Sequence, residues 1–263
     1  MTSEQSAIVR SPVAQVFAEP RVASAQISQL VAGRCVDLLE GRDDWYRVRG
    51  PDAYEGWLHR GHLTCSPDNG SSQNARFDRV SLGCITTNGN GARRAMPLGS
   101  LLSPEERLKN GEAIDVAEQV VLFPTGGEAI TRSAQLYFEG TSYLWGGVTP
   151  WGADCSGLVQ TIFWLHGIQL RRDAWQQAEQ GVPGEPGLLE ARTGDLLFFS
   201  DRVDSHITHV AIGLGDQRLV HLALGRGGYA VENLIDDGDP YVAKLRERFV
   251  MARRVLTPPP LRD

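Results

Sequence analysis

The sequence predicts an α+β protein in which short strands dominate the N-terminal half, while helices and strands share the C-terminal half. Large apolar and polar residues alternate along residues 43–49 and 54–58, a pattern typical of a half-buried antiparallel sheet. Farther along the chain, apolar residues recur at helical spacing after Glu128 and after Cys155. Two short apolar segments, separated by turn residues, then predict a β-hairpin over residues 209–223.

Breaks in this pattern divide the chain into three parts. A polar stretch at residues 67–74 separates the first strand-rich segment from a second one over residues 77–123. A helix is expected from Glu128 onward, and Gly140 is its stop signal. We therefore expect three domains, over residues 1–70, 71–125 and 126–263.

Length and charge limit the possible functions. The 263 residues have room for a catalytic domain of roughly 100 to 150 residues and one or two small modules. The formal net charge is −6 and no basic tract is present, which argues against nucleic acid or a membrane surface as a partner. The N-terminus lacks a basic region followed by an apolar run, and no segment approaches the roughly 18 apolar residues of a membrane span. We therefore expect a cytoplasmic protein.

The four cysteines show no metal-binding spacing, so we expect neither a metal nor another cofactor. Cys35, Cys65 and Cys84 are expected to be small buried residues. A reducing compartment suits a chain that must keep one cysteine as a thiol.

Cys155 has the context of a nucleophile. It follows Asp154 and a glycine-rich approach, at the first turn of a helix that Gly167 is expected to end. The unpaired N–H groups and the dipole of a helix N-terminus favour the thiolate, so we expect a lowered pKa for this thiol. A lone cysteine is more often a buried structural residue, and the functional interpretation therefore depends on partners elsewhere in the sequence.

Two histidines in the predicted hairpin supply these partners. If the strands pair symmetrically about Gly215, His209 and His221 lie directly opposite one another on one face, with Cβ atoms about 5 Å apart. His209 could then accept the proton of Cys155, while His221 orients His209 and stabilises its charged form. Each histidine alone is more often structural, but the three residues together predict a Cys-His-His catalytic set.

Five motifs in the C-terminal half occur in a characteristic order. They are Tyr-Leu-Trp-Gly-Gly at 143–147, Asp-Cys-Ser-Gly at 154–157, Arg-Asp-Ala at 172–174 with Gln177, Gly-Asp-Leu-Leu-Phe-Phe at 194–199, and the two histidines. This order resembles the NlpC-type, papain-like cysteine peptidases of bacterial cell-wall peptide. Thr193 stands where that family usually has proline and Ala211 where it often has glycine, but neither position carries chemistry.

Residues 7–66 resemble a bacterial SH3-like domain through their Trp-Tyr and Gly-Trp pairs. The resemblance as a whole implies an α+β papain-like catalytic domain preceded by two small all-β SH3-like barrels. The second barrel is implied only by the resemblance, since the residues over 77–123 indicate strands without a distinctive motif.

The resemblance also implies an activity, that of a γ-D-glutamyl-L-diamino acid endopeptidase in murein peptide recycling. Such an enzyme releases L-Ala-D-Glu from a murein tripeptide or tetrapeptide with a free amino terminus. Tyr143 and Trp145 would line the cleft, and the Tyr143 hydroxyl would join the Cys155 backbone N–H as an oxyanion donor. The residues implied in substrate binding are Tyr54, Asp154 and Glu19 around the amino terminus, and Ser156, Arg172 and Asp173 near the D-glutamyl unit.

Other interpretations remain open at this point. The SH3-like domains could be wall-binding tethers of an exported endopeptidase or amidase, or the chain could bind wall peptide without turnover. Asp154, His206 and His209 could be proposed as metal ligands, although no HExxH-like spacing supports them. An acyltransferase on the same Cys-His scaffold would need an apolar groove. Diaminopimelate or lysine at the third substrate position, and the oligomeric state, are not indicated by the sequence.

Overall fold

The computed structural model describes residues 5–65 and 77–256. The chain divides into two compact units, Met1–Gln119 and Val120–Asp263. This division lies close to the predicted boundary between residues 125 and 126. The other predicted boundary, between residues 70 and 71, falls outside the described residues.

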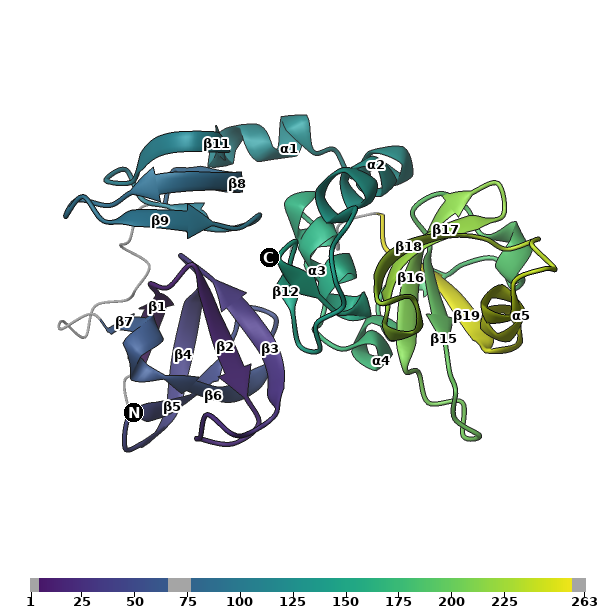
Figure 1. Cartoon of the computed structure of the whole chain (residues 1–263), viewed down its shortest axis with the longest axis horizontal. Coiled ribbons are helices and arrows are strands. Elements are labelled where there is room, and N and C mark those ends of the chain that lie inside the picture. Colours follow the sequence, from purple (N-terminus) through teal and green to yellow (C-terminus); the bar gives the residue numbers. More distant parts are fainter. Residues whose placement is uncertain (1–4, 66–76, 257–263) are drawn as a thin grey trace. The chain divides into compact units, whose positions relative to one another are not determined.

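The first part of the N-terminal unit is an antiparallel sheet of seven short strands in the order β3-β2-β6-β5-β4-β1-β7 (Figure 1). Alternate side chains of these strands enclose an apolar core that includes Val16, Val48 and Leu58, as the alternating sequence predicts. The strands are β1 (Gln5–Val9), β2 (Val13–Phe17), β3 (Gln26–Val31), β4 (Cys35–Arg42), β5 (Trp45–Arg49), β6 (Glu55–His59) and β7 (Leu63–Cys65).

The prediction that Cys35 is buried is wrong. Cys35 begins β4 with an exposed side chain, because the buried face of this strand starts at the next residue, Val36. Cys84 is buried as predicted, and the side chain of Cys65 lies outside the described residues.

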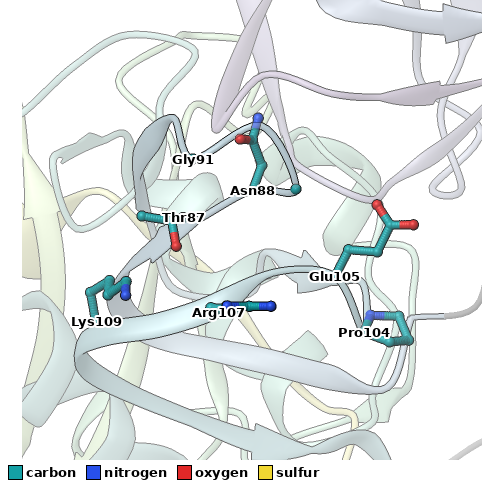
Figure 2. Close-up of a pocket in the computed structure, with 8 residues that line it drawn as sticks. Thr87, Asn88, Gly91, Pro104, Glu105, Arg107 and Lys109 are labelled. Carbon is teal, nitrogen blue, oxygen red and sulfur yellow. The ribbon is translucent and has the colours of Figure 1, made fainter.

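The second part of the N-terminal unit is a four-stranded sheet, as its strand-rich sequence predicts; that it is an SH3-like barrel stays a prediction. β8 (Arg79–Thr87) pairs along its whole length with β11 (Arg107–Asp115), while β9 (Arg93–Met96) and β10 (Leu101–Leu102) pair with its two ends. A pocket opens on this sheet beside the β8–β9 turn (Figure 2). Its polar lining carries both charges, with Arg107 and Lys109 beside Glu105, and includes no cysteine or histidine.

The C-terminal unit is built on a six-stranded antiparallel sheet in the order β14-β19-β15-β16-β17-β18 (Figure 1). A separate two-stranded ribbon, β12 (Val148–Thr149) with β13 (Gly152–Ala153), lies directly before the nucleophile helix in the chain. The strands of the main sheet are β14 (Val182–Pro183), β15 (Leu196–Phe199), β16 (His209–Gly215), β17 (Arg218–Ala223), β18 (Gly228–Asn233) and β19 (Phe249–Arg254).

Most helices of this unit pack on the sheet through their apolar sides, but the apolar side chains of α1 (Gln119–Leu122) are exposed. α3 contacts both β16 and β17, and α2 packs against α3 (Figure 1). Leu245 of α5 joins a core cluster with Phe199, Ala211 and Leu219 on the sheet. The helices are α1 (Gln119–Leu122), α2 (Gly127–Phe138), α3 (Cys155–Leu165), α4 (Ala174–Gln177) and α5 (Pro240–Glu247). Gly140 follows α2 with a φ of 77°, as the predicted stop requires.

Candidate active site

Cys155 is the first residue of α3, where the sequence predicts it. The helix forms here because Asp154 is its N-cap, with a carboxylate oxygen that accepts a hydrogen bond from the Gly157 N–H at 2.7 Å. At the other end, Gly167 adopts a φ of 75°, which ends the helix in the left-handed conformation. The thiol therefore lies on a rigid, capped helix end.

A buried ion pair holds this helix end in place. Nη2 of Arg172 lies 2.7 Å from Oδ2 of Asp154, with the two side chains only 1% and 8% exposed. Nη1 of Arg172 also donates to Oγ of Ser156 at 2.8 Å, and the Gly146 N–H donates to Asp154 at 2.8 Å. Arg172 is therefore a buried partner of the helix cap Asp154, and it holds the start of α3 in place.

These contacts limit how the residues expected to bind substrate could do so. Both carboxylate oxygens of Asp154 already accept hydrogen bonds, so a substrate ammonium would have to share them. The Arg172 guanidinium is buried, which leaves the half-buried Asp173 and the backbone as the parts of that segment able to meet a ligand. Substrate contacts by Asp154, Ser156, Arg172 and Asp173 stay predictions.

Two glycines allow the approach to the nucleophile to pack tightly. A Cβ atom at Gly157 would lie 2.0 Å from the carbonyl oxygen of Gly147, and a Cβ atom at Gly147 would lie 2.3 Å from the carbonyl oxygen of Gly152. Neither position has room for a side chain, because the obstacle in each case is backbone. The glycines of these two motifs therefore serve close packing of the segment against α3.

The two histidines share one face of the sheet, but they are not directly opposite each other. In the hairpin, Ile212 pairs with Val220 and Gly213 with Leu219, and a β-bulge follows before Gly215 pairs with Arg218. The pairs beyond the bulge are symmetric about Asp216, one residue from the predicted Gly215. Continued to its end, this register would place His209 two residues diagonal to His221 rather than opposite it.

The diagonal arrangement still brings the rings together. Nε2 of His209 lies 2.9 Å from Nδ1 of His221, and the ring centroids are 5.0 Å apart. The backbone N–H of Val210, next to His209, hydrogen-bonds the sulfur of Cys155. The sequence-predicted set of Cys155, His209 and His221 is thus brought to one place by α3, β16 and β17.

The sequence did not indicate two further members of this cluster. Oε1 of Glu232 on β18 lies 3.2 Å from Nε2 of His221, and Arg226 binds both oxygens of Glu232 at 2.8 Å. Glu232 is paired with Leu219 in the sheet, so it repeats the same diagonal step from His221. The only sequence signal was an acidic residue in an otherwise apolar strand, which does not identify its partner.

Burial dominates the titration of the thiol and the base. It raises the pKa of the Cys155 thiol to about 12, and the charge of Asp154 adds to this effect, while hydrogen bonds from the Val210 and Ser156 backbone oppose it. The pKa is therefore raised where the sequence predicts a lowered one, because burial outweighs the backbone hydrogen bonds that favour the thiolate. Burial, with the nearby His221 and Arg248, lowers the pKa of His209 well below 6.5. Both shifts favour the neutral form of the group.

Tyr143 and Trp145 lie on the segment that leads to the ribbon. The backbone of Tyr143 pairs with Ala153, while burial, followed by the charge of Cys155, raises the pKa of its hydroxyl. A phenol that stays protonated is a hydrogen-bond donor near the sulfur. Trp145 is 67% exposed, which suits a cleft wall. Their roles in the oxyanion site and the cleft stay predictions.

The remaining predicted binding residues lie in the N-terminal unit. Glu19 is exposed and forms an ion pair with Arg21 at 2.8 Å. Tyr54 is half-buried in the turn between β5 and β6, where its backbone N–H donates to Asp52. Binding of the substrate amino terminus by Glu19 and Tyr54 stays a prediction.

The metal alternative gains no support from this geometry. Asp154 is bound to Arg172, and the exposed ring of His206 lies beside Trp175. Within residues 5–65 and 77–256, no group of three or more cysteine, histidine or acidic side chains is arranged to hold a metal ion. No helix among these residues is long and apolar enough to cross a membrane.

Comparison with known proteins agrees with both parts of this architecture. Residues 140–241 match the NlpC/P60 family, and residues 16–63 match the bacterial dipeptidyl-peptidase SH3 domain. A structure of an NlpC/P60 family protein from Bacillus cereus has a TM-score of 0.80 at 18% identity and covers 96% of this chain and 100% of its own. An NlpC/P60 endopeptidase from Photobacterium damselae has a TM-score of 0.66 at 16% identity, covering 94% and 70%. These similarities show the fold.

Curated relatives are also similar along the sequence. The γ-D-glutamyl-L-lysine dipeptidyl-peptidase of Bacillus cereus is 26% identical over 236 residues, and the alignment covers 74% of this chain but only 66% of that relative. Dipeptidyl-peptidase 6 of Lysinibacillus sphaericus is 28% identical over 273 residues, covering 89% of this chain and 93% of the relative.

Fold and matches together define a hydrolase of the cysteine peptidase type. Residues 140–241 thus form an NlpC/P60 domain, and this domain follows a bacterial SH3 domain. The predicted papain-like α+β fold is thus confirmed.

Proposed function

We propose that the protein hydrolyses the γ-D-glutamyl-diamino acid bond of murein tripeptide or tetrapeptide with a free N-terminal L-Ala, releasing L-Ala-D-Glu. The observation that carries the proposal is the hydrogen-bonded His209–His221 pair beside a helix-terminal Cys155. The similarity to dipeptidyl-peptidases extends over the SH3 domain as well as the catalytic domain, which supports this substrate class.

In this mechanism Nδ1 of His209 is the base, because Nε2 is engaged with His221. The thiol proton moves to His209 as the sulfur attacks the γ-carbonyl carbon, and the Cys155 backbone N–H and the Tyr143 hydroxyl receive the oxyanion. The C–N bond then breaks and His209 returns the proton to the leaving amine. Water, activated by the same imidazole, hydrolyses the thioester. Since burial favours the neutral thiol, we expect proton transfer to His209 to accompany the attack.

Product analysis tests the substrate. Purified protein is incubated with free tripeptide, with N-acetylated tripeptide and with intact sacculi, and the products are identified by mass spectrometry. Release of L-Ala-D-Glu from the free tripeptide alone is the expected result. The Cys155→Ala variant is the control for contaminating hydrolases, and a wild-type rate for this variant would contradict the proposed nucleophile.

The free amino terminus is the second part of the proposal. An ammonium bound by acceptors such as Tyr54 and Glu19 makes charge-assisted hydrogen bonds, each of about 1.5–3 kcal/mol, that an acetylated terminus cannot make. We expect kcat/KM to fall by several orders of magnitude on acetylation, and Tyr54→Phe to lose less activity than Tyr54→Ala. Equal kcat/KM for the two peptides would show that no such pocket closes on the terminus.

Equal kcat/KM for the free and the N-acetylated tripeptide would favour the alternative function, an exported wall endopeptidase or amidase with SH3 domains as tethers. A specific similarity supports keeping this alternative. The murein DD-endopeptidase/LD-carboxypeptidase MepS of Escherichia coli is 36% identical, but over only 121 residues, covering 46% of this chain and 58% of its own. Cleavage of sacculi that is lost when the N-terminal unit is altered, with no preference for a free terminus, would decide for the alternative. Cytoplasmic recycling predicts the opposite preference.

A further inference from the structure

A buried carboxylate, that of Glu232, is hydrogen-bonded to His221, the second histidine of the His209–His221 pair. Glu232 is 4% exposed, and its Oε1 lies 3.2 Å from Nε2 of His221. Nε and Nη2 of Arg226 bind its two oxygens, each at 2.8 Å. The three side chains His209, His221 and Glu232 therefore form a continuous diagonal across β16, β17 and β18.

We propose that Glu232 is a positioning residue that sets the tautomers of both histidines, so that Nδ1 of His209 presents a lone pair to the thiol. The proposal rests on the cysteine peptidase mechanism above, but not on which peptide is cleaved. Glu232 touches neither the nucleophile nor the expected substrate, and it acts through His221.

The direction of the hydrogen bonds follows from what each group can do. An ionised carboxylate only accepts, so Nε2 of His221 must carry the proton that it shares with Glu232. Nδ1 of a neutral His221 is then an acceptor, and the proton between the rings must belong to Nε2 of His209. A neutral His209 has one ring proton, so its Nδ1 is left unprotonated and able to take the proton of Cys155.

Arg226 keeps Glu232 in the acceptor state. Its fork binds both carboxylate oxygens and also Asp239, and its guanidinium lies 4.3 Å from the centre of the Tyr241 ring. Burial alone would raise the pKa of Glu232, but the hydrogen bonds from His221 and Arg226 outweigh burial and lower it to about 2. The charge of Arg248, which faces His209, also disfavours a second proton on that ring.

The isosteric variant Glu232→Gln should reverse the direction of the hydrogen bonds that link His209, His221 and residue 232. With the amide oxygen at the position of Oε2, where it accepts from Nη2 of Arg226, the NH₂ group takes the position of Oε1; there it loses the bond from Nε of Arg226 and donates to Nε2 of His221. His221 would then hold its proton on Nδ1 and donate to Nε2 of His209, which would place the remaining proton of His209 on Nδ1. The base would be blocked while the volume of the side chain is unchanged.

Steady-state kinetics on the full chain give the first test. We expect Glu232→Gln to lower kcat by roughly 10²- to 10⁴-fold with little change in KM, the size of effect that a wrong histidine tautomer has on a catalytic triad. Glu232→Asp is shorter but still only accepts, and should retain more activity than Glu232→Gln. Asp237→Asn, which removes an exposed ion pair with Arg246 elsewhere in the same unit, is the matched control and should keep the wild-type rate.

Nitrogen-15 NMR of the histidine rings in the full-length resting protein gives a substrate-independent reading. Protonated Nε2 in both His209 and His221 is expected in the wild type, and protonated Nδ1 in both is expected in Glu232→Gln. A protonated Nδ1 of His209 in the wild type would overturn the proposal, as would Glu232→Gln activity equal to or above that of Glu232→Asp. If wall peptides were not cleaved at all, the tautomers would still be read, so failure of the proposed substrate and failure of this inference are distinguishable.

A double-mutant cycle tests whether Glu232 acts on His209 through His221. His221→Gln removes the ring through which Glu232 acts, so adding Glu232→Gln to it should cause little further loss in kcat. Multiplicative losses in the double variant would show that Glu232 acts independently of His221, and would contradict the proposed role.

Discussion

Replacing Arg172 with methionine should destabilise the helix that carries the nucleophile. The side chain is 1% exposed and its partner Asp154 is 8% exposed, so the substitution leaves a buried carboxylate without its counter-ion. Removing one partner of such a buried pair typically costs about 3–5 kcal/mol. The loss should be concentrated at the start of α3, where Asp154 also caps the helix.

Hydrogen exchange of the full chain, read by mass spectrometry, measures this cost locally, because protection of the α3 amides reports the free energy of opening that segment. The matched control is Arg202→Met, which removes an ion pair of 2.8 Å, close to the 2.7 Å of the Arg172 pair, whose side chains are both 57% exposed. That variant should leave the exchange of α3 unchanged. Adding Asp154→Asn to Arg172→Met should recover part of the loss, since the unpaired charge is then gone while an oxygen remains to cap Gly157.

The reasoning would be refuted if Arg172→Met changed the exchange of α3 no more than Arg202→Met does. It would also be refuted if Asp154→Asn made Arg172→Met worse, because the cost would then come from lost packing and not from the uncompensated carboxylate.

Three further predictions follow from the site. Only a neutral His209 accepts a proton, and its pKa is lowered, so the acidic limb of kcat/KM should lie below pH 6.5; a midpoint at or above 6.5 would contradict the buried base. With a pKa of about 12, Cys155 should react with iodoacetamide at pH 7 more slowly than a free thiol of pKa about 8.5, with Cys155→Ala as the blank; a rate above that of the free thiol would indicate a preformed thiolate. Gly157→Ala should abolish most turnover, because its Cβ would lie 2.0 Å from a backbone oxygen, and a wild-type kcat would show that α3 can shift at no cost.

Local patterns in the sequence predicted the elements that carry the candidate site. Apolar spacing and Gly167 gave the bounds of α3, and turn residues gave the hairpin that carries His209 and His221. The shared face of the two histidines was predictable because strand side chains alternate strictly. Their diagonal offset was not, since a β-bulge in this hairpin leaves no signature in its residues.

Features that depend on packing between segments distant in the chain could not be predicted from the sequence. Arg172 was expected near the substrate, yet its partner Asp154 lies 18 residues earlier in the chain and the pair is buried. Glu232 could not be linked to His221 without the pairing of β17 with β18. The raised pKa of Cys155 follows from its burial, a property of the folded unit that its helix position alone does not reveal.

The tight turn of the β16–β17 hairpin limits how this protein can be engineered. Asp216 and Gln217 adopt φ values of 48° and 58°, and together with the bulge they determine which strand positions meet. Exposed turns are usually chosen for epitope tags, linkers or new chain termini because the fold tolerates them. An insertion here that slipped the pairing by one residue would turn the His221 ring to the other side of the sheet. Such a fusion protein could be well expressed and folded yet inactive, so this turn is a poor site for a tag.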